Sequence, residues 1–376
     1  MTVSSDAPDI AIFLPSLEGG GAERVMAILA NGFAGRGYRV DLVLVEASGP
    51  YLARIGANVR VVELGSGSVI RSVRPLARYL RRERPRALLA ALSHANIVAI
   101  LAHRLSRSRA RLVVSERLSL AAARRYSRGL RYQVIRRLMG PTYRLADRVV
   151  VVAAAMIGEL KEHLRLPDDR LECIYNPVVD DELVEAAAQP CAHPWLAVDA
   201  SIPVVLGCGR LSAQKDFATL IDAFQIVRSR RPAKLIVLGE GEDRAALQAR
   251  IDASDFEADI DLPGFTANPF AFMSRASVFV LSSIYEGMPG ALIQAMACGA
   301  PLVSTDCPTG PEEILEDGRW GALVPMCDPA AMAAAIERAL DVPPANACSR
   351  AAAFAEPEAV SRYLAALGLP AHATRC

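Results

Sequence analysis

Three short glycine-containing segments hold the side chains and amides with which this chain could handle a phosphate group. The clearest of them, residues 207–216, places Arg210 and Lys215 in a loop between an apolar strand and a helix. A guanidinium and an ammonium can both neutralise a diphosphate, and both stabilise negative charge that grows on a leaving group. A bare Arg/Lys pair is more often a solvated surface feature, but the flanking glycines and the strand–loop–helix position favour phosphate binding.

The second segment, Glu-Gly-Met-Pro at residues 286–289, precedes a helix expected at 289–297. Pro289 suits the first turn of a helix, and Gly299 suits the position just after its end. The free backbone amides at the start of this helix could hold a phosphate or a hydroxyl group. Glu286 by itself could equally be a plain cap of the helix, and the residue types do not separate these two interpretations.

The third segment is a turn of three glycines, Gly19, Gly20 and Gly21, between a strand expected at 10–14 and a helix expected at 22–33. Glycines let the backbone approach a phosphate or sugar closely, and a helix N-terminus favours an anion. The turn does not match the dinucleotide fingerprint GxGxxG, and no acidic residue stands where a ribose would need one. An ordinary tight turn stays open as the alternative.

Strand and helix patterns alternate along the whole chain, and the strands are continuous apolar runs, which indicates parallel sheets covered by helices on both faces. The predicted fold class is therefore α/β, with two Rossmann-like doubly wound parallel-sheet domains facing a central cleft, and ligand beyond the carboxyl ends of the strands. The expected strands are 10–14, 40–45, 59–64, 87–92, 112–114 and 149–152 in the first domain, and 203–208, 235–238, 260–262, 278–281 and 301–304 in the second.

A length of 376 residues suits two domains. Prolines and polar residues mark a linker, so we expect an N-terminal domain at 1–178, a linker at 179–200 and a C-terminal domain at 201–350.

The net charge of +1 hides a division between the two halves of the chain. Residues 1–180 hold 28 Lys and Arg against 16 Asp and Glu, whereas the remainder holds 14 against 25. Arginines gather around two helical segments, 71–86 and 124–137, and a basic amphipathic helix can lie on an anionic membrane. The alternative is a solvated arginine-rich surface. A nucleic-acid partner is not expected, because no recognisable nucleic-acid module accompanies the arginines.

The eight cysteines include no CxxC pair, so neither a zinc site nor a redox motif is predicted. The first residues lack a basic segment followed by a long apolar run, and no apolar stretch is long enough to span a bilayer. We therefore expect a cytoplasmic protein, with peripheral contact to the cytoplasmic face of the inner membrane through the basic N-terminal domain.

Together these segments make the chain similar, over nearly its whole length, to the retaining GT-B glycosyltransferases of the GT4 family, also called glycosyltransferase group 1. Its resemblance is strongest to members that extend bacterial exopolysaccharide, capsule or lipid-linked glycans. The matching segments are Gly-Gly-Ala-Glu-Arg-Val (20–25), Ser-His-Ala-Asn-Ile-Val (93–98), Ile-Tyr-Asn-Pro-Val (174–178), Gly-Arg-Leu-Ser-Ala-Gln-Lys-Asp-Phe (209–217), Leu-Gly-Glu-Gly (238–241), Glu-Gly-Met-Pro (286–289) and Ser-Thr-Asp-Cys-Pro-Thr-Gly-Pro-Glu-Glu-Ile (304–314).

The resemblance implies a nucleotide-sugar site in the C-terminal domain and an acceptor site in the N-terminal domain, with a C-terminal helix at about 355–368 that packs back on the latter. The matching Arg and Lys bind the donor diphosphate, the matching Glu contacts the donor sugar, the loop at 264–265 borders the nucleobase, and the glycine turn closes over the diphosphate. The implied donor-binding residues are Gly19, Gly20, Gly21, Arg210, Lys215, Gly264, Phe265, Glu286, Gly287, Met288, Pro289 and Gln294.

One position departs from the family pattern. The family has a second glutamate eight residues after the first, which holds the ribose hydroxyls, and here that position is Gln294. An amide oxygen still accepts a hydroxyl proton, but without charge, so we expect weaker or differently tuned ribose binding.

Two residues after strands are expected near the reacting groups. The resemblance places His94 near the donor sugar and the acceptor hydroxyl, as a catalytic candidate alongside Arg210, Lys215 and Glu286, while a helix-capping or supporting histidine is the alternative. Glu116 is a candidate for holding acceptor hydroxyls.

The implied activity is retaining transfer of a sugar from a nucleotide diphosphate sugar, expected to be UDP-linked, to a hydroxyl of a glycan or polyprenyl-diphosphate-linked acceptor, with no metal and no other cofactor. This is the hexosyltransferase class. A nucleotide-sugar epimerase or a phosphorylase on the same architecture, and a non-catalytic nucleotide-sugar-binding partner of a transferase, stay open as alternatives.

Overall fold

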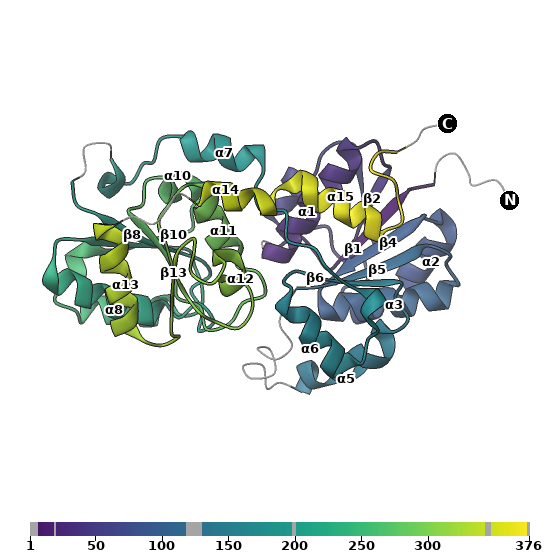
Figure 1. The fold of residues 1–376 in the computed structure, drawn as a ribbon. Coiled ribbons are helices and arrows are strands. Elements are labelled where there is room, and N and C mark those ends of the chain that lie inside the picture. The colour runs from purple at the N-terminus through teal and green to yellow at the C-terminus, as the bar shows by residue number, and fades with distance from the viewer. Residues whose placement is uncertain (1–6, 19, 118–129, 198–200, 343–346, 374–376) are drawn as a thin grey trace. The chain divides into compact units, whose positions relative to one another are not determined.

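The computed structural model describes residues 7–18, 20–117, 130–197, 201–342 and 347–373 of the chain. Its internal contacts divide the chain into two compact units. The first unit consists of Met1–Pro177 together with Glu356–Cys376, and the second unit is Val178–Ala355. Figure 1 shows that each unit is a sheet covered by helices.

The first unit has a fully parallel sheet with the strand order β3-β2-β1-β4-β5-β6-β7. Because chain order reverses between β1 and β4, the sheet is doubly wound. Its strands are β1 (Ile10–Leu14), β2 (Val40–Leu44), β3 (Val59–Glu63), β4 (Ala87–Ala91), β5 (Arg111–Glu116), β6 (Arg148–Val151) and β7 (Leu171–Cys173). Its helices are α1 (Gly21–Gly35), α2 (Val73–Glu83), α3 (Ser93–Ser106), α5 (Leu130–Tyr143), α6 (Ala155–Leu164) and α15 (Glu356–Ala366).

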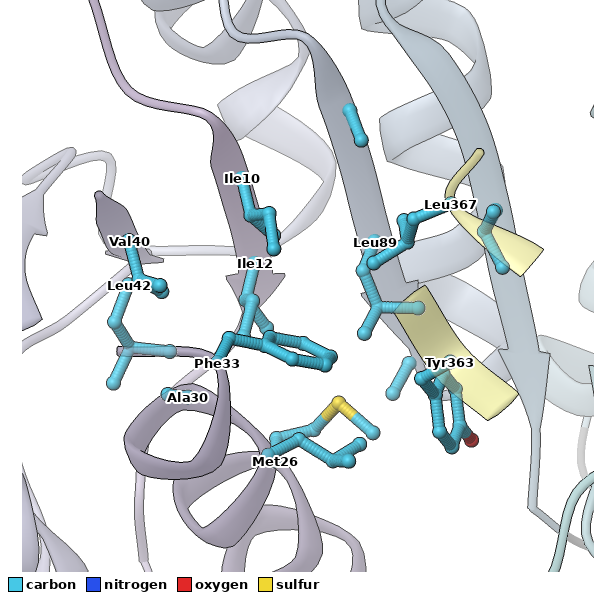
Figure 2. Packing of buried hydrophobic residues seen from close by; sticks show 14 of the residues in the cluster. Ile10, Ile12, Met26, Ala30, Phe33, Val40, Leu42, Leu89, Tyr363 and Leu367 are labelled. Atoms are coloured by element: carbon cyan, nitrogen blue, oxygen red, sulfur yellow. The ribbon is translucent and has the colours of Figure 1, made fainter. Parts of the chain in front are cut away.

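The core of the first unit is built from side chains that alternate between the two faces of the strands and from apolar side chains at helical spacing on α1. Ile10 and Ile12 project from β1 to one face of the sheet, where Met26 and Phe33 of α1 pack on them (Figure 2). The last helix, α15, packs beside α1 and adds Tyr363, which is fully buried in the same cluster. Each large apolar side chain buried in this way stabilises the fold by about 1.5–3 kcal/mol.

The second unit repeats this architecture with the strand order β10-β9-β8-β11-β12-β13, again fully parallel. Its strands are β8 (Val204–Cys208), β9 (Lys234–Leu238), β10 (Ile260–Gly264), β11 (Val278–Leu281), β12 (Leu302–Thr305) and β13 (Ala322–Val324). Its helices are α7 (Asp181–Ala188), α8 (Phe217–Arg230), α9 (Arg244–Asp252), α10 (Phe270–Met273), α11 (Gly290–Ala297), α12 (Pro311–Leu315), α13 (Pro329–Asp341) and α14 (Cys348–Ala351). The predicted α/β class with two doubly wound parallel sheets is confirmed.

The stretch expected as a linker, 179–200, contains a helix. The Asp180 carboxylate accepts a hydrogen bond of 2.8 Å from the backbone amide of Leu183 and so caps α7. Helix α7 packs on α10, which gives this stretch contacts within the second unit.

The strands β7 and β13 were not predicted, because each is only three residues long and shows no periodicity. Within the described part of the chain, no helix combines the length and the hydropathy that a membrane span requires.

Candidate functional site

The sheet order of the second unit brings together two loops that lie far apart in sequence. Strands β8 and β11 are neighbours, and from them the chain winds toward opposite edges of the sheet. Ligands of doubly wound folds bind beyond the carboxyl ends of the strands at this reversal point. The loop after β8 carries Arg210 and Lys215, and the loop after β11 carries Glu286.

Lys215 and Glu286 form an ion pair at this point. Nζ of Lys215 lies 2.5 Å from Oε1 of Glu286, and the side chains are only 18% and 9% exposed. The Ser283 hydroxyl donates a second hydrogen bond, of 2.7 Å, to the same carboxylate oxygen. Helix α11 has no side-chain cap, and its N-cap residue is Pro289, so Glu286 is not the helix cap that its sequence position also allowed.

Further hydrogen bonds join the two loops and fix the position of the ion pair. Gln214 donates from its side chain to the carbonyl of Tyr285 at 2.9 Å, and its own carbonyl accepts from the amide of Ile284 at 2.9 Å. The Ser282 hydroxyl donates to the carbonyl of Lys215 at 2.6 Å. Because both loops are tied through their backbones, the pair is held by the loop structure as well as by its own attraction.

Arg210 has a different carboxylate partner. Its Nε lies 3.1 Å from Oε2 of Glu242, and the two side chains are 74% and 56% exposed. A hydrogen bond to its own backbone and the charge of Arg210 lower the pKa of Glu242. An exposed ion pair contributes little to stability, so an incoming anion can displace this carboxylate readily.

The Arg210 loop rests directly on the backbone of the loop after β9. The amide of Leu211 donates to the carbonyl of Glu240 at 2.9 Å. Gly239 has a φ of +134°, and a Cβ added there would lie 1.9 Å from the carbonyl oxygen of Gly209. Only glycine allows this approach.

The loop after β12 supports residues 286–289, all of which are buried. The Thr309 hydroxyl donates to the carbonyl of Glu286 at 2.5 Å. Gly310 has a φ of +99°, and a Cβ added there would lie 2.5 Å from Cδ of Pro289. The segment that the sequence predicts to lie beside a donor sugar is therefore held at both of its ends by this one loop.

The remaining candidates of the second unit lie around these loops. Gly264 ends β10 with a φ of +89°, and Phe265 after it is 80% exposed. An aromatic ring held in solvent is free to stack on a planar group such as a nucleobase. Gln294 is half-buried on α11, eight residues after Glu286.

In the first unit, the glycine turn lies at the start of α1. Gly20 is the N-cap and Gly21 the first helical residue, while Gly19 lies outside the described residues. A Cβ added at Gly20 would lie 2.1 Å from Oε2 of Glu23, so this carboxylate folds back over the turn. The helix start expected to attract an anion thus already holds a negative charge of its own.

His94 lies in the first turn of α3, where it is half-buried. Leu92, just before this helix, has a φ of +79°, a conformation that costs about 1–3 kcal/mol for a residue with a side chain. The Ser93 hydroxyl donates to Glu116 Oε1 at 2.9 Å, and the Tyr143 hydroxyl donates to Oε2 at 2.7 Å. Because Glu116 is only 1% exposed, it anchors the strained turn and is not an open ligand for acceptor hydroxyls.

In the described ranges of the chain, no group of three or more His, Cys, Asp or Glu side chains could hold a metal ion. The sequence has one Asp-x-Asp segment, 259–261, and both of its carboxylates have partners. Asp259 pairs with Arg228 and Lys234, and Asp261 pairs with His193.

Comparison with known families covers most of the chain. Residues 19–182 match the model described as Glycosyltransferase Family 4, and residues 202–341 match the model described as Glycosyl transferases group 1. The chain belongs to the GT4, or group 1, glycosyltransferases.

Individual relatives of this glycosyltransferase agree with the assignment. An uncharacterised glycosyltransferase of Methanocaldococcus jannaschii is 32% identical over 191 residues. These residues span 50% of this chain and 47% of the relative, so this chain covers about half of the relative's length. The N-acetylgalactosamine-N,N'-diacetylbacillosaminyl-diphospho-undecaprenol 4-alpha-N-acetylgalactosaminyltransferase of Campylobacter jejuni is 26% identical over 328 residues, 84% of this chain and 85% of the relative.

Solved structures show the fold of the enzyme. Anabaena HepE in complex with UDP superposes with a TM-score of 0.78 at 19% sequence identity, covering 96% of this chain and 99% of that one. The glycosyltransferase therefore has the GT-B fold, with two Rossmann-like domains.

Sequence reasoning missed several side chains that hold the site of this glycosyltransferase. Ser283, Glu242 and Thr309 contact Glu286 or Arg210 only because the chain folds their loops together. Only Thr309 lies inside one of the segments that resemble the family, 304–314, and a hydroxyl or carboxylate in a loop carries no signal of its partner.

Proposed function

We propose that this glycosyltransferase moves a sugar from a UDP-sugar to a hydroxyl of a glycan or polyprenyl-diphosphate-linked acceptor in the synthesis of bacterial surface polysaccharide. The observation that carries the proposal is the buried Lys215–Glu286 pair at the reversal point of the second sheet. The complex of HepE with UDP supports the nucleotide, and the diphospho-undecaprenol substrate in the name of the Campylobacter relative supports the acceptor.

The donor diphosphate would exchange for the carboxylates that now hold the two cations. Arg210 would leave the exposed Glu242, and Lys215 would turn from Glu286 toward a phosphate oxygen. Glu286 would then accept a hydrogen bond from a hydroxyl of the donor sugar, while Ser283 keeps it in place. Two fixed cations neutralise the charge of the departing diphosphate without a metal ion, which is why we propose a metal-independent reaction.

The proposed transfer keeps the configuration at the anomeric carbon. The bond from this carbon to the phosphate oxygen breaks, a bond to the acceptor oxygen forms on the same face, and the acceptor proton passes to the departing phosphate oxygen. The transition state resembles an oxocarbenium ion, as in glycoside hydrolysis. Once Lys215 has turned to the phosphate, Glu286 would still accept hydrogen bonds from Ser283 and from the donor sugar, which lowers its nucleophilicity and favours this route over a covalent intermediate.

The first unit would supply the acceptor side of the reaction. His94, in the turn anchored by Ser93 and Glu116, is the residue that we propose to lie near the donor sugar and the acceptor hydroxyl. We further propose a location on the cytoplasmic face of the inner membrane, because the basic first unit would meet an anionic lipid surface there.

The experiment that tests the function is a thermal-shift panel with UDP, GDP, ADP and their sugars, followed by transfer assays on the donor that binds. UDP and one UDP-sugar should stabilise the protein. Arg210→Ala and Lys215→Ala should lower turnover by about a hundredfold or more. Arg250→Ala is the matched control, because Arg250 forms an exposed ion pair with Asp222 in the same unit.

Three results would contradict parts of this proposal. Near-normal turnover of Lys215→Ala would show that Lys215 does not bind the diphosphate. If EDTA abolished the activity and added Mg²⁺ restored it, the reaction would not be metal-independent. A product of inverted anomeric configuration, read by NMR, would exclude the retaining route.

A further inference from the structure

Helices α2, α3 and α5 form one layer on the sheet of the first unit. The crossovers β3–α2–β4, β4–α3–β5 and β5–α5–β6 all step toward the same edge of the sheet. Right-handed crossovers in one direction place their helices on one face, and α3 contacts both α2 and α5 (Figure 1). The sides of these helices that point away from the sheet therefore share one outer surface.

This outer surface exposes large aliphatic side chains at helical spacing. On α3, Leu101 is 42% and Leu105 is 51% exposed, and on α5, Val134 is 47% and Leu138 is 44% exposed. Residues four apart lie above one another on a helix, so each helix presents an apolar stripe outward. Isolated exposed leucines are common, but two aligned pairs on adjacent helices form a patch that calls for a partner.

The charges on the same layer are almost all positive. The sequences of α2, α3 and α5 contain eight arginines and a single acidic residue, Glu83. Glu83 is already engaged, since Arg60 and Arg82 both pair with it. Arg104 and Arg137 are exposed and lie within the two apolar stripes, three residues after Leu101 and Val134.

We propose that this surface, made by Leu101, Arg104, Leu105, Val134, Arg137 and Leu138 and called here the α3–α5 face, docks on an anionic lipid bilayer. Arginines bind the lipid headgroups while the aliphatic side chains between them enter the boundary with the acyl chains. The arginines of this face would also suit the phosphates of a nucleic acid, but its exposed leucines would not. This proposal rests on the membrane contact proposed above and names the residues that would make it. Its test measures vesicle binding and requires no turnover, so the docking surface and the proposed transfer reaction can fail separately.

The test is cosedimentation of the full chain with vesicles of phosphatidylcholine alone and of phosphatidylcholine containing about a third phosphatidylglycerol. The wild type should bind the anionic vesicles and lose affinity in high salt. Leu105→Gln with Leu138→Gln should weaken binding at least about tenfold at every salt concentration, because the apolar contribution is not screened. Arg104→Gln with Arg137→Gln should weaken it by a similar factor at low salt only.

Val184→Gln is the matched control, since Val184 is 60% exposed on α7 of the second unit, and it should bind like the wild type. All variants replace exposed residues, and equal thermal melting curves will show that they fold. Unchanged vesicle binding of the double leucine variant overturns the proposal. The proposal is also overturned if the wild type binds an RNA duplex as tightly as it binds the anionic vesicles and only the arginine variant loses that binding. It is overturned as well if the wild type is a dimer and the double leucine variant is a monomer.

Discussion

Lys215 and Glu286 stand 71 positions apart in the sequence and form a 2.5 Å ion pair in the second unit. The pair exists because β8 and β11 are adjacent in the sheet, so that the loops leaving their carboxyl ends meet. In the free protein it neutralises both residues. In the proposed reaction the same two residues separate, one toward the phosphate and one toward the sugar.

Loss of Lys215 should destabilise the fold as well as stop the reaction. Lys215→Met leaves the buried Glu286 carboxylate with the Ser283 hydrogen bond but without its counter-charge, and we expect the free energy of unfolding to fall by about 2–4 kcal/mol. Arg250→Met, which breaks an exposed pair, should cost less than about 1 kcal/mol. Urea unfolding of both variants measures the difference, and equal losses would show that burial of the Lys215 pair has no energetic consequence.

Removal of the Glu242 charge should tighten donor binding. Glu242→Gln frees the Arg210 guanidinium from a competing carboxylate, and we expect the affinity for UDP to rise about two- to fivefold. Isothermal titration calorimetry measures this change. Asp222→Asn, which frees Arg250 in the same way, is the control and should have no effect. A weaker affinity in Glu242→Gln would mean that the carboxylate helps to place Arg210.

Gln294 can be tested by restoring the residue that the family has at this position. Gln294→Glu supplies a charged acceptor for the ribose hydroxyls, and we expect UDP to bind about tenfold more tightly. Binding of inorganic pyrophosphate, which has no ribose, should stay the same. If the affinities for UDP and for pyrophosphate rise together, residue 294 acts on the diphosphate and not on the ribose.

The close approach at Gly239 predicts a strong effect of a single methyl group. Gly239→Ala must displace the backbone of Gly209, one residue before Arg210, and we expect both a lower melting temperature and weaker UDP binding. Gly158→Ala on α6 is the control, because nothing lies within 4 Å of the added Cβ, and alanine there should stabilise the helix by up to about 1 kcal/mol. Differential scanning fluorimetry compares the two.

Glu83 predicts a pH-dependent contribution to stability. Hydrogen bonds from Arg60 and Arg82 lower the pKa of Glu83 below its ordinary value of 4.5. Its ionised form therefore stabilises the fold at neutral pH, and this contribution is lost as the pH falls through the folded-state pKa. We expect Glu83→Gln to be less stable than the wild type by about 1 kcal/mol at pH 7 and equally stable once the pH lies below the folded-state pKa of Glu83. A difference that persists in acid would assign the effect to packing.

Much of the fold could be predicted from the sequence because it depends on local patterns. Continuous apolar strands such as Ile10–Leu14 and Val204–Cys208, each followed by a glycine-containing loop and a helix, indicated parallel doubly wound sheets. The cations Arg210 and Lys215 could be predicted as candidate phosphate ligands because both lie in one loop of this kind. The segments that resemble the family identified the enzyme class.

Which charges meet was decided only by the tertiary structure. The sequence alone left Glu286 as a helix cap or a ligand, and sheet order excluded the cap by placing Glu286 against Lys215 and Ser283. It left Glu116 as an acceptor ligand, and burial beneath Ser93 and Tyr143 made it an anchor. Residue types and spacing report what an element is and which chemistry it carries. The partner of a side chain depends on which strands are neighbours, and that arrangement forms only when the whole sheet packs.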